Sequence, residues 1–72
     1  SIHPNPSTGN FWINSDVEIK YIEIYNSHGK LVQTEQLQSK IAEIKTQLEK
    51  GIYFLVSYTT TNQKHTHKFI IQ

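Results

Sequence analysis

The sequence predicts a small all-β domain, an antiparallel β-sandwich of about six or seven short strands. Runs of β-branched and aromatic residues recur along the whole chain, and apolar residues alternate with polar ones in several of these runs. Turn signals separate the runs at intervals of about 8–12 residues, which is typical of a sandwich. With 72 residues the chain is long enough for one domain, residues 1–72.

Composition excludes several classes of function. The net charge is +1, from seven lysines against six acids, and there is no arginine, so the chain lacks the dense basic patch of a nucleic-acid-binding protein. There is no cysteine for a disulfide, and no apolar run approaches the roughly 20 residues of a membrane span. The start, Ser1-Ile2-His3, has no initiator Met. We expect a fragment, one end of a longer polypeptide, and any targeting signal of that polypeptide would lie upstream.

The first element is a rigid turn over residues 4–9, since proline fixes φ and donates no backbone hydrogen bond. It leads into a predicted strand over Asn10–Ser15, with Phe11 and Ile13 on one face. Ser15-Asp16 predicts a turn after that strand.

The next two runs predict a β-hairpin. Val17–Tyr25 is rich in β-branched and aromatic residues, and its apolar parity changes between Tyr21 and Ile22, which predicts a bulge. A turn at Asn26–Gly29 then leads into a strand over Lys30–Leu37.

Residues 36–49 are ambiguous. Ile41, Ile44 and Leu48 have helical spacing, and the composition favours helix, so a helix and a strand have about even support here. The strand-like neighbours favour a short strand around Ala42–Lys45 and a turn at 49–51.

The last two strands are predicted at Gly51–Thr59 and His65–Gln72, joined by a polar turn at 60–63. Gly51–Thr59 is apolar on nearly both faces, so it is either covered on both sides or leaves an aromatic row at the surface.

No catalytic or metal constellation stands out, and we predict neither an enzyme nor a cofactor. His65 and His67 share one face of a strand, but a zinc site needs at least three protein ligands. Asp16 and Glu18 could form a carboxylate pair, yet no serine elbow accompanies them. The aromatic residues are expected mainly in the core, with a sugar-binding surface as the alternative: Trp12, Tyr21, Tyr25, Tyr53, Phe54, Tyr58 and Phe69.

Four phrases follow one another in a particular order along the chain. They are Pro4–Gly9, then residues 22–32 with Asn26, Gly29 and Lys30, then residues 48–55 with Gly51-Ile52-Tyr53, and finally Lys68–Gln72. This order resembles the type A C-terminal sorting domain of the bacterial type IX (Por) secretion system, over essentially the whole chain.

The resemblance implies an Ig-like sandwich of about seven antiparallel strands that acts as a C-terminal secretion signal. It implies passage through the periplasm, recognition by the translocon and its shuttle barrel protein, removal by a sortase-like cysteine peptidase, and a secreted or surface-attached cargo. The alternative is an adhesive or carbohydrate-binding module of a secreted protein.

The family motif carries over to ten residues of this sequence: Pro4, Asn5, Pro6, Gly9, Asn26, Gly29, Lys30, Gly51, Tyr53 and Lys68. His3 departs from the family, in which an apolar residue often precedes the first proline. We also expect the last strand to lie at a sheet edge, where its free backbone groups could pair with a partner strand. Lys68 could then meet an acidic patch on the receptor.

Overall fold

The computed structural model describes all residues, 1–72, and contains only strands and loops. The strands are β1 (Ile2–His3), β2 (Asn10–Asn26), β3 (Leu31–Lys45), β4 (Gly51–Thr59) and β5 (Lys64–Ile71). All four strand pairings are antiparallel, in the order β1-β2-β4-β5 with β3 also paired to β2. The prediction of an all-β antiparallel fold is therefore confirmed. No helix has the length and hydrophobicity needed to cross a membrane.

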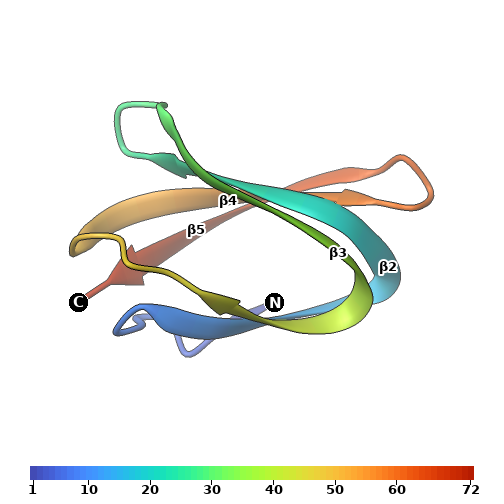
Figure 1. The fold of residues 1–72 in the computed structure, drawn as a ribbon, viewed down its shortest axis with the longest axis horizontal. Helices are drawn as coiled ribbons and strands as arrows, with labels where there is room; N and C mark the ends of the chain where they lie inside the picture. Colours follow the sequence, from blue (N-terminus) through green and yellow to red (C-terminus); the bar gives the residue numbers. More distant parts are fainter.

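The sheet folds over on itself into two layers because β2 and β3 bend together (Figure 1). The lower layer holds β1, the start of β2 and the end of β3, where Phe11 pairs with Ile44. The upper layer holds the rest of β2, the start of β3, β4 and β5. The core lies between the layers.

The bends lengthen β2 and β3, which explains why there are five strands instead of about seven short ones. The predicted turn at Ser15-Asp16 is wrong, since β2 continues through it with a register shift between Asn14 and Ile19. There the Ser15 hydroxyl bonds to both backbone groups of Val17. β3 passes its own bend at Gln38, whose φ is 82°. Both bends are irregularities inside strands, so the chain turns without ending its pairing.

The ambiguous segment is strand, and the helical alternative is wrong. Residues up to Lys45 belong to β3 and pair with the first half of β2. Ile44 is fully buried whereas Ile41 is 57% exposed, so the two do not share one apolar face. Long-range pairing and the burial of Ile44 override the local helix propensity.

Isoleucines dominate the core, joined by two phenylalanines whose ring centroids are 4.8 Å apart. The buried cluster comprises Phe11, Ile13, Ile19, Ile22, Ile24, Ile44, Tyr53, Leu55, Phe69 and Ile71. The predicted parity change in β2 occurs, but between Ile19 and Tyr21, slightly earlier than expected. Ile19 and Ile22 therefore both face the core while Tyr21 faces solvent.

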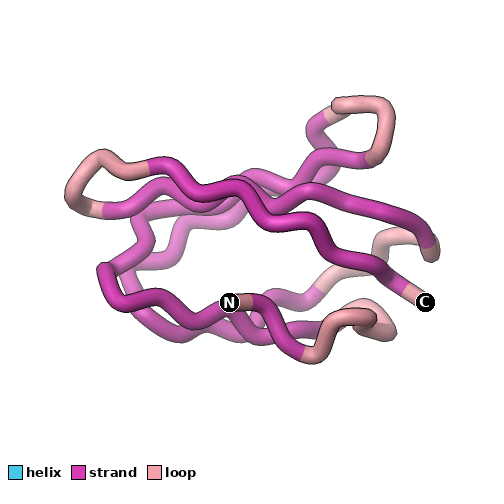
Figure 2. The backbone as a smooth tube through the Cα atoms, turned by 180° about the vertical axis from the view of Figure 1, so that it is seen from behind, coloured by secondary structure: helices cyan, strands magenta, loops and turns pink.

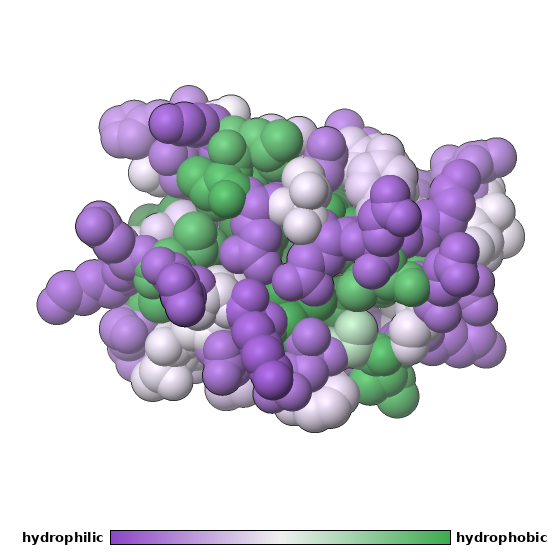
Figure 3. Space-filling view, viewed as in Figure 1, coloured by the Kyte–Doolittle hydropathy of each residue, from purple (hydrophilic) through white to green (hydrophobic).

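The expectation that most aromatic residues form the core is wrong. Of the seven that the sequence singled out, only Tyr53 and Phe69 are buried, while Trp12, Tyr21 and Phe54 are exposed. The reason is the parity of the strands, which turns the even-numbered residues of β4 outward. Hydrophobic side chains consequently interrupt a mostly hydrophilic surface (Figure 3). Of the two alternatives for β4, the structure shows a strand that is not covered on both sides, since Ile52 and Phe54 are exposed on its outer face.

Candidate recognition site

The Pro-Asn-Pro loop fastens the start of the chain to the last strand. Asn5 Nδ2 donates to the Lys68 carbonyl (3.4 Å), and its Oδ1 accepts from the Ile70 amide (3.0 Å). Ser7 then forms a parallel bridge with Ile71, through bonds of 2.8 Å to Ile70 and Gln72. The predicted rigid turn is thus a clamp along the outer edge of β5 (Figure 2).

Ser7 and Gly9 hold the end of this loop in place. The buried Ser7 hydroxyl donates to the Asn10 carbonyl (2.7 Å) and accepts from the Gly9 amide (3.1 Å). Gly9 has φ 130°, and its carbonyl accepts from the Thr46 amide and hydroxyl. A Cβ at Gly9 would lie 3.4 Å from the Thr46 carbonyl oxygen, so glycine suits both the conformation and the space. The Ser7 hydroxyl bonds to backbone groups two and three residues on, as is typical of a serine in a turn.

The second motif shapes the β2–β3 turn. The Asn26 side-chain oxygen accepts from the amides of His28 (2.9 Å) and Lys30 (3.0 Å), while the Asn26 carbonyl accepts from Gly29. Gly29 has φ 82°, with nothing near its Cα that a side chain would meet. Asn26 and Gly29 thus stabilise the turn, and the Lys30 side chain is exposed.

The third motif stabilises the start of β4. Tyr53 is buried, its hydroxyl donates to the Glu49 carbonyl (2.6 Å), and its ring stacks at 5.8 Å on Phe69. Gly51 pairs with Ile71, directly beside the clamp at Ser7.

The structure brings the four motifs to one end of the molecule. Asn26 pairs with Tyr53, Tyr53 pairs with Phe69, and the neighbouring Lys68 carbonyl is bonded to Asn5. In Figure 1 this is the end at which the C-terminus lies, together with the turn between β2 and β3 and the loop before β4. Phrases spread over the sequence therefore lie at one end of the molecule, which we call the motif end.

The bonds from Asn5 and Ser7 reduce the number of β5 backbone groups that are free to pair with a partner strand. β5 lies at an edge of the sheet, as expected, but its backbone groups at Lys68–Gln72 are largely occupied by Asn5 and Ser7. Alternate residues of a strand direct their backbone groups to the same side. Thr66 and Lys64 therefore keep their backbone groups outward, and only this first half of β5 remains open to pairing.

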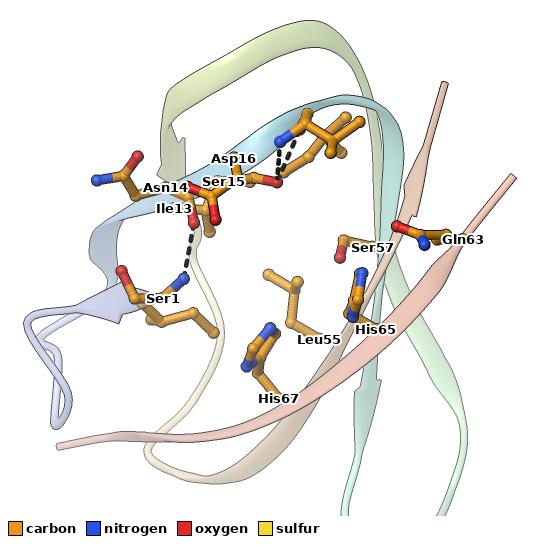
Figure 4. Close-up of a pocket in the computed structure, with 13 residues that line it drawn as sticks. Ser1, Ile13, Asn14, Ser15, Asp16, Leu55, Ser57, Gln63, His65 and His67 are labelled. Carbon is orange, nitrogen blue, oxygen red and sulfur yellow. Dashed lines mark hydrogen bonds between the residues drawn. The ribbon is translucent and has the colours of Figure 1, made fainter. Parts of the chain in front are cut away.

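A cleft of about 330 Å³ lies next to the open half of β5 (Figure 4). Leu55 and Ile13 contribute to its apolar floor, and His65, His67 and Asp16 lie at its polar rim. Burial lowers the pKa of His67, helped by the positive charges of the amino terminus and of His65. The structure contains no group of three or more His, Cys, Asp or Glu side chains arranged to hold a metal ion.

Comparison with known proteins agrees with this arrangement. The family model described as a secretion system C-terminal sorting domain matches residues 1–72. PorZ, described as an essential bacterial surface component of the type IX secretion system of Porphyromonas gingivalis, contains a similar fold with a TM-score of 0.78 at 13% identity. The similarity covers 100% of this chain and 11% of the PorZ chain. No curated protein sequence matches this chain. Because the family model spans the whole chain, this protein belongs to the family of type IX secretion-system C-terminal sorting domains.

Proposed function

We propose that this domain is a sorting signal. The type IX translocon and its shuttle barrel protein recognise it, and a sortase-like cysteine peptidase then removes it. The family match over residues 1–72 carries the proposal. The cargo precedes the domain in the same chain, crosses the periplasm, and is released or attached at the cell surface.

The motif end supports this role. Eight of the ten motif residues, all except Pro4 and Pro6, have side chains or backbones engaged in turns, bridges or the core, so they shape a surface rather than perform chemistry. Pro4, Pro6 and the side chains of Lys30 and Lys68 are exposed beside them, where a partner protein can contact them. In this proposal the ten motif residues build and present the surface that the translocon reads.

A reporter fusion tests the proposal. The 72 residues are fused to the C-terminus of a periplasmic reporter and expressed in hosts with and without the type IX system. We expect the reporter in the medium or on the cell surface only in the first host. Equal retention of the reporter in the periplasm of both hosts would contradict the sorting role.

The same culture tests removal by the peptidase. Mass spectrometry of the secreted reporter should find a C-terminus upstream of, or near, Ser1. A secreted reporter that still carries all 72 residues would refute the cleavage step and leave the sorting role intact.

A carbohydrate-binding or adhesive module is the second candidate, because Trp12, Tyr21 and Phe54 are exposed on strands. The two functions separate in a pull-down of the purified domain on insoluble polysaccharides. Binding that is lost on Phe54→Ser or Trp12→Ser would favour this second function.

A further inference from the structure

The outer face of the upper layer carries a carboxylate surrounded by tyrosines. Glu23 lies on the part of β2 that pairs with β4, and Glu23 Oε1 accepts from the hydroxyls of Tyr58 (2.8 Å) and Tyr25 (3.0 Å). Tyr21 stacks on Tyr58 with ring centroids 4.5 Å apart. We call these four residues the Glu23 cluster.

Apolar side chains extend the same face. Phe54 pairs with Tyr25, and Ile52 pairs with Ile70, so all of them point outward with the cluster. Phe54 is 36% exposed and Ile52 is 43% exposed, although a strand residue facing a second layer would be covered. The face is therefore a sheet surface with a carboxylate at its centre and exposed aromatic and apolar side chains around it. Tyrosine and phenylalanine are enriched in protein-binding surfaces.

On this face, neither β2 nor β4 carries a lysine beside the Glu23 carboxylate that could neutralise its negative charge. The lysines of this face are Lys64 and Lys68 on β5, which lies beyond β4 as seen from β2. Adjacent strands are about 4.8 Å apart, so the two backbones are separated by about 10 Å. A cation supplied by a partner would complement Glu23.

The cluster favours a guanidinium group over other cations. Both bonds use Oε1, so Oε2 of Glu23 and the lone pairs of the two phenol oxygens accept no hydrogen bond from within the protein and are available to a donor from a partner. Arginine offers five donors in a planar fork and an apolar stem that can lie on Phe54. A sugar would need the flat face of a ring, but Tyr21 and Tyr58 turn their faces toward each other at an interplanar angle of 18°.

We propose that the outer face around Glu23 docks an arginine-bearing surface of a type IX translocon protein. This inference rests on the sorting function proposed above and names a second surface, which borders the motif end at Lys68, through which the domain is recognised.

Two matched pairs of variants test the inference in the reporter fusion. Glu23→Gln removes the charge but keeps an acceptor for the tyrosines, and Glu43→Gln removes an equal charge from the exposed face of the lower layer, where Glu43 pairs with Trp12. A photoreactive phenylalanine analogue replaces either Phe54 or Trp12, which are comparably exposed aromatic residues on opposite layers.

We expect Glu23→Gln to lower the secreted fraction by about tenfold, as for loss of one charge-assisted contact, and Glu43→Gln to leave it unchanged. The analogue at Phe54 should crosslink to a translocon protein, and the one at Trp12 should not. Thermal unfolding of each purified variant confirms that the fold is retained.

The inference fails alone if the parent fusion is secreted and Glu23→Gln matches it, or if crosslinks form only from Trp12. Crosslinks to polysaccharide instead of protein would also overturn it. A parent fusion that stays in the periplasm would overturn the sorting function and this inference together.

Discussion

At the scale of single residues, Glu23 shows how one side chain sets the ionisation of its neighbours. Its hydrogen bond to the Tyr58 hydroxyl, assisted by burial and by the negative charge of Glu23, raises the pKa of Tyr58 to about 12. The same causes raise the pKa of Tyr25. Both phenols are neutral donors in the folded protein, and ionisation of either would place two negative charges side by side.

Titration of the tyrosines tests this arrangement. Because the folded pKa of Tyr58 lies above its unfolded value of about 10, its contribution to stability is present below pH 10 and is lost as the pH rises through about 12. We expect tyrosinate absorbance of the folded protein to show a late-ionising group that moves back toward 10 in Glu23→Gln. Glu35→Gln, on the neighbouring strand β3, is the control and should leave the titration unchanged. A Tyr58 that titrates normally in the parent protein would refute the hydrogen bond.

At the scale of elements, local sequence identified most strands but not their ends. Ser15-Asp16 and Gln38-Ser39 are polar and flexible, and such residues mark a turn in most β proteins. Here the serine hydroxyls bond the backbone two residues on, which permits a bend while the strand continues. The local signal is the same for a turn and for a bend, and only pairing with a distant strand distinguishes them.

The contact between the Pro-Asn-Pro loop and β5 could not be predicted from local sequence either. The partners of the Asn5 side chain, Lys68 and Ile70, lie 63 and 65 residues away, whereas an asparagine in a turn usually bonds to nearby backbone. The amide of Asn5 offers the same donor and acceptor as a peptide group, and it continues the pairing of β5 between two prolines that have no N–H. The ten motif residues were identified from the family resemblance alone, and nothing in their spacing predicted that they meet at one end.

Substitution of Asn5 tests this clamp. Asn5→Ala removes one donor and one acceptor, and we expect the free energy of unfolding to fall by about 1–2 kcal/mol. Asn14→Ala is the matched control, since Asn14 is exposed and its side chain makes no hydrogen bond. Urea denaturation of both variants measures the difference. Equal midpoints would mean that the clamp contributes no stability.

At the scale of the whole molecule, the last strand serves both the core and the closure of the sandwich. Phe69 and Ile71 are buried between the layers, while Ser7 and Asn5 hold the outer edge of the same strand. β5 lies at the sheet edge as expected, but local sequence does not show that Asn5 and Ser7, far away in the sequence, occupy that edge. Loss of the C-terminus therefore affects folding before it affects any recognition surface.

Deletion of Lys68–Gln72 should consequently unfold the domain. Removal of a buried phenylalanine or isoleucine costs about 2–5 kcal/mol each, and a domain of this length has about 4–11 kcal/mol in total. Lys68→Gln is the informative partner variant, because it keeps both core residues and the carbonyl that Asn5 bonds, and changes only an exposed charge. We expect circular dichroism to show cooperative melting for Lys68→Gln and none for the deletion. A deletion variant that still melts cooperatively would contradict the argument that the last strand closes the sandwich.

The secreted fraction of Lys68→Gln then tests whether Lys68 itself contacts the translocon. Because this variant is expected to fold, a fall in its secreted fraction would assign the contact to the Lys68 side chain. The deletion cannot show this, since it removes the fold as well as the charge.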